Sequence, residues 1–182
     1  MGKILLVDYS KKPSIIGYPR EGETCYKKMG QSIPSPSHSI VFHSKKRGKE
    51  KIDTTQLVIE KLEKEFYKKN VKKIQGGEFP DLRIMEELFY NIRYIPTEWE
   101  RIGEFFHFFG TILRETKGKE SFMVPYLKTA RKERGAGFEW CFGCRLFNDR
   151  SGEPETNWEE NDYVVRFKDQ ILQEEFAELS CF

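Results

Sequence analysis

The sequence contains few cysteines and no long hydrophobic run. Its four cysteines, Cys25, Cys141, Cys144 and Cys181, are too few and too widely spaced for a disulfide-stapled scaffold, so we expect free thiols. No stretch approaches the roughly 20 consecutive apolar residues that span a bilayer. The apolar run at residues 4–7 is also too short for a signal peptide. These absences predict a cytoplasmic protein that does not associate with membranes.

The common sequence signatures of catalysis are also missing. There is no G-x-x-x-x-G-K-[ST] phosphate loop, no G-x-G-x-x-G after a strand, no G-x-S-x-G and no H-E-x-x-H. The acidic stretch at residues 153–162 lacks the spacing and the glycine of a calcium loop. We therefore expect no cofactor, and a protein without catalytic activity is favoured over an enzyme.

Aromatic and charged residues, in contrast, are abundant. Aromatic residues make up 14% of the 182 residues, so a modest number of apolar positions can still build a core. The formal net charge is only +2, but it is unevenly distributed. Residues 137–182 contain eleven acidic and four basic residues, a net of −7, which leaves +9 on residues 1–136. A basic body favours nucleic acid or an acidic partner, unless the acidic region neutralises it within the fold.

Apolar runs predict short strands toward both ends of the chain. The expected strands are residues 3–9, 14–18, 39–43, 121–124, 138–142 and 163–167. Glycine, proline and polar residues predict a long loop or partner arm at 19–38 and an acidic loop at 148–162. A short basic helix or turn is expected at 126–134 and a final helix at 171–179.

Three further helices are expected in the middle of the chain. The first follows a cap at residues 53–55, and the second opens at Pro80. The third opens at Pro96, and apolar residues recur at helical spacing around most of residues 99–113, which predicts deep burial. We therefore predict one α+β domain over residues 1–182, in which a mostly antiparallel sheet of N- and C-terminal strands is covered by these three helices.

The region from residue 128 to residue 140 combines cations, glycines and an aromatic strand. Its four cations are Lys128, Arg131, Lys132 and Arg134. Cations neutralise phosphates, glycines let backbone N–H groups approach an oxyanion, and an exposed ring such as Trp140 stacks on unpaired bases. The pattern favours a nucleic-acid contact. A basic helix end capped by Gly135, with the rings buried, is the structural alternative.

Two other groups of cations stand out. A second candidate contact for nucleic acid is formed by Lys45, Lys46, Arg47 and Lys49. Lys68, Lys69, Lys72 and Lys73 are instead expected to keep the end of a helix in contact with water.

Arg101 and His107 have a spacing similar to the R-x(4–6)-H pair of the HEPN ribonucleases, an all-helical class. In such a pair the histidine exchanges a proton with the ribose, while the arginine stabilises phosphate charge. The resemblance implies a metal-independent ribonuclease. A histidine at the rim of a helix, one turn after Glu104, is the non-catalytic alternative, and the strands expected elsewhere do not suit an all-helical class.

Cys141 and Cys144 form a C-x-x-C and are the candidate metal ligands. Zinc requires four ligands, and no second C-x-x-C is present. On an extended strand the two sulfurs would point to opposite faces, so two buried structural thiols are favoured over a metal site.

Together these patterns predict a non-catalytic nucleic-acid-binding protein, with RNA favoured, that serves as a small subunit of a ribonucleoprotein complex. Two alternatives stay open. One is the metal-independent ribonuclease that uses Arg101 and His107. The other is a protein-interaction module that docks on a basic partner through its acidic region at 153–178.

Overall fold

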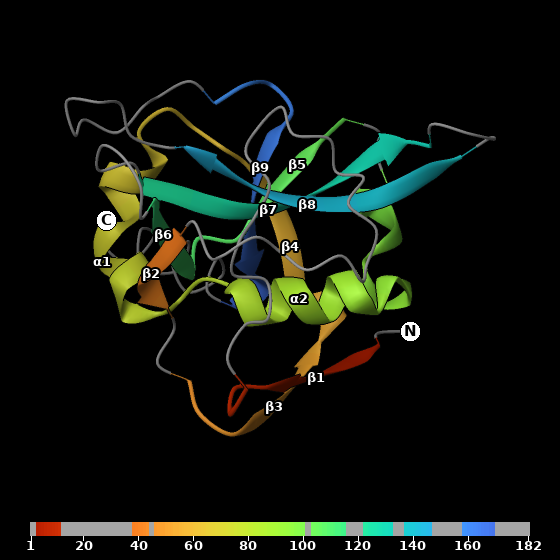
Figure 1. Cartoon of the computed structure of the whole chain (residues 1–182), viewed down its shortest axis with the longest axis horizontal. Coiled ribbons are helices and arrows are strands. Elements are labelled where there is room, and N and C mark those ends of the chain that lie inside the picture. Colours follow the sequence, from red (N-terminus) through yellow and green to blue (C-terminus); the bar gives the residue numbers. More distant parts are fainter. Residues whose placement is uncertain are drawn as a thin grey trace, which may run out of the picture.

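The fold is described from a computed structural model (Figure 1). It describes residues 3–11, 38–43, 46–100, 103–115, 122–132, 137–146 and 158–169. Several predicted elements lie outside these residues: the strand at 14–18, residues 19–37 of the long loop, residues 148–157 of the acidic loop and the helix at 171–179.

Strands dominate the described part of the chain. They are β1 (Ile4–Asp8), β2 (His38–His43), β3 (Lys49–Asp53), β4 (Leu57–Lys61), β5 (Phe105–His107), β6 (Thr111–Glu115), β7 (Phe122–Arg131), β8 (Phe138–Leu146) and β9 (Asp162–Phe167). The α-helices are α1 (Phe66–Gly76) and α2 (Leu82–Tyr90), and 3-10 turns occur at Thr54–Gln56, Ile92–Tyr94 and Thr97–Trp99. No helix in the described ranges is long and apolar enough to cross a bilayer.

Seven strands form one branched sheet with β7 at its centre. β8 pairs with one edge of β7, while β6 and β5 share the other edge. β2 extends the branch that begins at β6, and β9 and β4 extend the branch that begins at β5. Among the described strands, β5 and β9 are the one parallel pair of this sheet, so the predicted antiparallel character is largely correct.

α2 lies between this sheet and a two-stranded ribbon formed by β1 and β3 (Figure 1). One core cluster joins the three layers: it contains Leu5 from the ribbon, Met85 from α2 and Leu127 from β7. α2 forms where the sequence predicts it, because the Asp81 side chain caps it by accepting from the backbone N–H groups of Arg83 and Ile84 at 3.0 and 3.2 Å.

α1 belongs to a second core cluster at one end of the sheet. Its Phe66 ring packs against the rings of Phe79 and Phe109, with centroid distances of 5.6 and 5.0 Å. Ile74 of α1 is buried in the same cluster, together with Val164 of β9. The apolar side of α1 therefore faces the protein interior.

The predicted central group of three helices is wrong. The described part of the chain has two α-helices, and the segment expected to be the best-buried helix, 96–113, forms a 3-10 turn followed by β5 and β6. Gly110 explains why a helix does not fit there. Its N–H donates to the Pro80 carbonyl at 3.0 Å, and a Cβ at Gly110 would lie 2.3 Å from the Phe79 carbonyl oxygen. The chain must turn tightly at this point.

Two other helical predictions are corrected in the same way. The helix expected after residues 53–55 is replaced by a 3-10 turn capped by Asp53, by β4 and then by α1, which begins at Phe66. The short basic helix or turn expected at 126–134 is a strand as far as Arg131, because β7 continues through it. In the first segment the buried residues of the predicted apolar side are Leu62, which lies between β4 and α1, and Phe66, which lies on α1.

Candidate functional site

The cations predicted to contact nucleic acid lie at the end of β7. Lys128 is half-buried, whereas Arg131 and Lys132 are exposed. Arg134 lies outside the described residues. Because side chains alternate along a strand, Lys128 and Arg131 point to opposite faces of the sheet. The structure therefore separates cations that the sequence placed in one patch.

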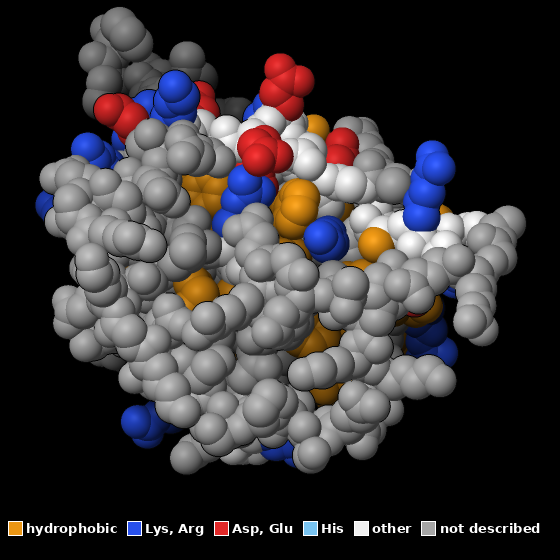
Figure 2. Space-filling model, turned by 45° about the horizontal axis from the view of Figure 1, so that its top comes forward, with side chains coloured by type: hydrophobic (Ala, Val, Ile, Leu, Met, Phe, Trp, Pro, Cys, Tyr) orange, Lys and Arg blue, Asp and Glu red, His pale blue; other side chains and the backbone are white. Residues whose placement is uncertain are grey.

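Lys128 lies on the face of the sheet that points away from α2. Cross-strand pairing places it beside Phe105 of β5, and Tyr126 is paired with His107 in the same way. The Lys128 ammonium lies 4.8 Å from the Phe105 ring centroid and 5.9 Å from that of Tyr126. Figure 2 turns this side of the molecule toward the viewer and shows Lys and Arg side chains beside hydrophobic and acidic ones.

Gly143 of β8 permits the packing of this face. It is the cross-strand partner of Tyr126. A Cβ at Gly143 would lie 2.5 Å from the Tyr126 hydroxyl and 2.7 Å from its Cζ. The tyrosine ring therefore lies across the strand at a position where only glycine leaves space.

Trp140, the predicted stacking ring, lies on the other face of the sheet. It is half-buried, it pairs with Thr129 of β7, and its ring centroid is 6.0 Å from that of Phe106. It packs against the core cluster that contains Leu127 and Met85. Two half-buried rings lie near the cations of the opposite face. Phe105 lies beside Lys128, and Trp158 lies beside Arg145.

A buried ionic cluster lies beside Lys128, and the sequence did not reveal it. Asp162 and His107 are fully buried, and the Asp162 Oδ1 lies 2.8 Å from the His107 Nε2. Arg145 donates to the same oxygen at 2.8 Å, and the Glu159 backbone N–H donates to the other oxygen of Asp162 at 2.6 Å. One carboxylate thus joins β5, β8 and β9. We call Asp162, His107, Arg145 and Glu159 the Asp162 cluster.

Aromatic rings enclose the Asp162 cluster. The Trp158 ring meets that of His107 edge-on at 5.1 Å, and the Arg145 guanidinium lies 5.3 Å from the Phe105 centroid and 5.9 Å from the Trp158 centroid. Burial alone would raise the pKa of Asp162, but its hydrogen bonds to His107 and Glu159 and the charge of Arg145 hold that pKa below its usual value. The carboxylate is therefore ionised in the folded protein at neutral pH.

The position of His107 differs from the one that the candidate ribonuclease pair requires. Arg101 lies outside the described residues, and His107 sits on the strand β5 instead of the helix that the HEPN pattern requires. The His107 side chain is fully buried and engaged by Asp162. It is placed to hold the fold together, because a general base must reach the proton of its substrate.

The second candidate patch is only partly described. Lys45 lies outside the described residues, and Arg47 and Lys49 are exposed. Lys46 forms an ion pair with Glu50 at 2.9 Å, and its ammonium lies 5.1 Å from the centroid of the Phe167 ring. Lys46 therefore ties the start of β3 to the end of β9.

The two cysteines of the C-x-x-C lie on one continuous strand, β8, and both are buried. Cys144 belongs to the core cluster beneath the sheet, whereas Cys141 is the partner of Lys128 and points to the other face. Burial raises the pKa of the Cys144 thiol. No group of three or more potential metal ligands occurs within the described ranges.

The acidic region contributes partners to the basic body at particular points. Asp162 engages His107, whereas in the Arg166–Glu60 pair, at 2.8 Å, the cation comes from the acidic region and the carboxylate from the basic body. Neither Lys128 nor Lys132 forms an ion pair with a carboxylate of the residues that the structure describes. Among the described residues, the acidic region therefore does not neutralise Lys128 or Lys132.

No known family model, curated protein or solved structure matches this chain. The fold and the site therefore define its class directly. It is an α+β protein whose branched sheet is covered by α2 on one face and presents cations and aromatic rings on the other.

Proposed function

We propose that the protein binds nucleic acid, with RNA favoured, through the end of β7. The observation on which the proposal rests is the environment of Lys128: its ammonium lies on the Phe105 ring, 4.8 Å from the centroid, and pairs with no carboxylate of the described residues. Lys132 follows four residues later and is exposed. Cations that no carboxylate of the described residues neutralises gain the most from phosphates, because contact releases the counterions of the nucleic acid.

The proposal is for binding without catalysis. His107, the histidine of the candidate ribonuclease pair, is fully buried, meets the Trp158 ring edge-on and is engaged by Asp162. The half-buried ring of Phe105 supplies aromatic surface beside Lys128, and the half-buried ring of Trp158 lies next to Arg145. Aromatic surface next to cations is typical of sites for single-stranded nucleic acid. The two free thiols described, Cys141 and Cys144, fit the reducing conditions of the cytoplasm, where we place the protein.

The test removes two charges from β7 with the variant Lys128→Gln/Lys132→Gln. Binding to a fluorescent single-stranded RNA is measured by anisotropy at several salt concentrations, with single-stranded DNA and duplexes as competitors. We expect affinity to fall about fivefold to tenfold, and the log–log salt slope to become shallower by about 1.4, since each single-strand phosphate contact contributes about 0.7.

The matched control is Lys11→Gln/Lys51→Gln. Both lysines are exposed, Lys11 shortly after β1 and Lys51 on β3, in the ribbon that α2 separates from the sheet, so this variant removes the same charge at a distant site. Equal affinities for the β7 variant and this control would refute the proposal. Salt-sensitive binding to a basic protein, with none to nucleic acid, would instead favour the protein-interaction module.

A further inference from the structure

Among the described strands, β1 and β3 pair only with each other, so one edge of each strand is open in this part of the chain. The Tyr9 N–H donates to the carbonyl of Gly48, just before β3, at 2.7 Å. Because backbone groups alternate in direction along a strand, the odd-numbered residues of β1 bond to β3. The N–H and C=O groups of Ile4 and Leu6 therefore point to the other edge, where no described residue bonds to them.

The side chains of β1 alternate in the same way. Leu5 and Val7 are buried in the core cluster that contains α2, whereas Ile4 and Leu6 are 51% and 52% exposed. The strand carries no charge from Ile4 to Val7. An uncharged edge that combines open backbone groups with exposed apolar side chains is suited to pairing with another strand.

The edge of β3 has a different character. By the register of the ribbon, the backbone groups that point to this edge belong to Lys49, Lys51 and Asp53. Both lysines are exposed. Charged side chains, and lysine above all, are a common means by which proteins keep an edge strand from pairing. The ribbon thus has charged residues along one edge and apolar residues along the other.

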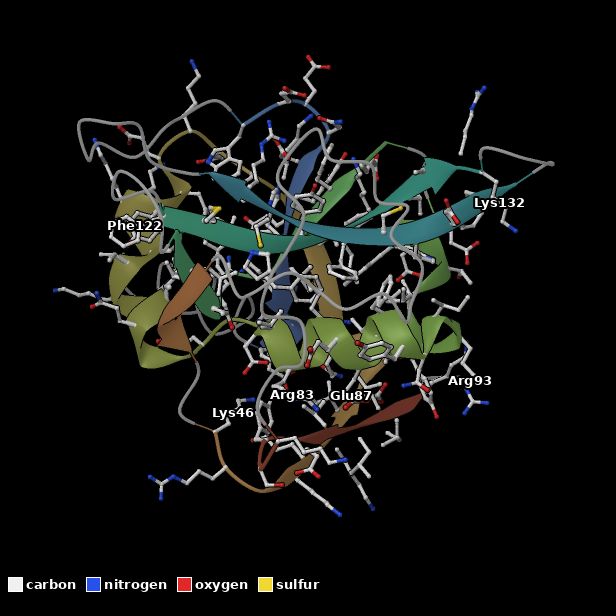
Figure 3. All side chains as sticks on the ribbon, in the orientation of Figure 1. Lys46, Arg83, Glu87, Arg93, Phe122 and Lys132 are labelled. Atoms are coloured by element: carbon white, nitrogen blue, oxygen red, sulfur yellow. The ribbon has the colours of Figure 1, made fainter. Side chains whose placement is uncertain are left out.

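More apolar surface lies near the start of β1. The Lys3 side chain donates to the Arg93 carbonyl, which brings the turn after α2 to this end of the ribbon (Figure 3). Ile92, in that turn, is 58% exposed, and Arg93 is exposed as well. A strand added to β1 therefore has a further apolar side chain and a cation close by.

The backbone and the charge of the ribbon together select the kind of partner. Paired N–H and C=O groups require a partner that both donates and accepts in a row, which favours a peptide over the phosphates of a nucleic acid. Residues 3–11 and 46–53, which include the ribbon, contain six basic and three acidic residues, a net of +3. A second copy of this chain would bring the same positive charge, whereas an acidic segment is attracted.

We propose that the open edge of β1 binds an extended segment of a partner protein as an added strand. The segment places apolar side chains beside Ile4 and Leu6 and carries a net negative charge. α2 separates the ribbon from the sheet, so this surface does not overlap the end of β7 (Figure 1). The inference and the proposed function can therefore fail independently.

Amide hydrogen exchange, measured for each residue by NMR, tests the edge directly. In the protein alone, the amides of Ile4 and Leu6 should exchange faster than those of Leu5 and Val7, which bond to β3. The probe is a fluorescein-labelled peptide in which valine alternates with threonine and glutamates stand at both ends. Its addition should slow the exchange of Ile4 and Leu6. Slow exchange of both amides in the protein alone would mean that the edge is already occupied, and the inference would be wrong.

The variant Leu6→Pro removes one donor from the open edge. This N–H does not bond to β3, so proline should leave the ribbon intact and the melting temperature nearly unchanged. Affinity for the peptide, measured by anisotropy, should fall about tenfold, because an acceptor of the peptide loses its partner. The matched control Leu6→Val keeps the N–H and an apolar side chain, and its affinity should stay within about twofold of the wild type.

Equal affinities for Leu6→Pro and Leu6→Val, or no binding of the peptide at millimolar concentration, would overturn the inference. The exchange measurement needs no variant, so it remains decisive if proline disrupts the ribbon.

Three comparisons identify the occupant. A peptide with lysines in place of the glutamates should bind about fivefold more weakly at low salt, and equal binding would contradict an acidic partner. A dimer in sedimentation that Leu6→Pro converts to a monomer would place a second copy at the edge instead. Displacement of the peptide by single-stranded RNA would show that the ribbon attracts polyanions through charge alone. Either of these last two results would refute binding of a partner strand.

Discussion

Charges are arranged in opposite ways in the Asp162 cluster and on the exposed side of α1. In the cluster, Asp162 is buried between His107 and Arg145, so its carboxylate has an opposite charge beside it. On α1, Lys68, Lys69 and Lys72 are exposed, and both side chains of the Lys69–Glu63 ion pair are more than half exposed. Buried charges require partners because desolvation is expensive, whereas exposed charges are screened by water and salt. The first arrangement supports the fold, and the second contributes little to its stability.

A second buried ionic group follows the same rule as the Asp162 cluster. Arg83 of α2 pairs with Glu86 and Glu87 on its own helix, and Glu86 is fully buried. Figure 3 shows Arg83 and Glu87 on the side of α2 that faces the ribbon.

Tyr9, at the end of the ribbon, has a raised pKa, chiefly because it is buried and also because Asp81 and Glu50 lie near it. Its hydroxyl therefore stays protonated.

The largest expected effect comes from removing the central carboxylate with Asp162→Ala. This change leaves the buried His107 and Arg145 without their shared acceptor, and loss of one partner from a buried pair costs about 3–5 kcal/mol. The free energy of unfolding is measured by urea titration with tryptophan fluorescence. A loss below about 1 kcal/mol would mean that the cluster does not support the fold, and the contrast with α1 would disappear.

Acid should weaken the cluster selectively. The pKa of Asp162 is lower in the folded protein than in the unfolded chain, so its contribution to stability is complete above the ordinary aspartate pKa of about 3.9 and is lost as the pH falls below it. We therefore expect Asp162→Asn, unfolded in urea between pH 3 and pH 6, to lose less stability on acidification than the wild type.

Other carboxylates set the background for this measurement. Asp8 and Asp53 also have lowered pKa values, because each accepts hydrogen bonds from a residue two positions later, and both remain in the variant. Some acid sensitivity should therefore persist. Identical pH profiles for Asp162→Asn and the wild type would contradict the assignment.

The smallest expected effect comes from Glu159→Gln. Its carboxylate lies 3.4 Å from the Arg145 guanidinium, but the Glu159 side chain is 68% exposed. Exposed pairs contribute about 0–1 kcal/mol, so the free energy of unfolding should change by less than that. The backbone N–H of Glu159, which donates to Asp162, is unaffected by the change. A loss of stability as large as that of Asp162→Ala would contradict the prediction that exposed charges contribute less to stability than buried ones.

Part of the fold follows from local sequence signals. The helix predicted to open at Pro80 is α2, which begins at Leu82 after the Asp81 cap, and the alternation at 138–142 and the run at 163–167 correspond to β8 and β9. The strand at 39–43 corresponds to β2. These signals succeed because a cap and an alternating pattern depend on residues that are neighbours in the chain.

The segment 96–113 shows where local signals fail. Phe106, Phe108 and Phe109 are all fully buried. Because apolar residues occur at most positions of this segment, their spacing fits a helix as well as a strand. The sequence by itself determined that this segment is buried, that α2 forms and that the body of the chain is basic. Its conformation was decided by strands β7 and β9, which supply the backbone partners of β5.

The Asp162 cluster was likewise decided by tertiary structure, because 55 residues separate its carboxylate from His107 and only the parallel pairing of β5 with β9 brings them together. An aspartate that precedes a strand gives no sign of a distant partner. The separation of Lys128 from Arg131 has the same origin, since the pairing of β7 with its neighbours made a strand of a segment whose composition also suited a helix or turn. Composition determines which side chains can be buried or charged, whereas hydrogen bonding between distant strands determines which of them meet.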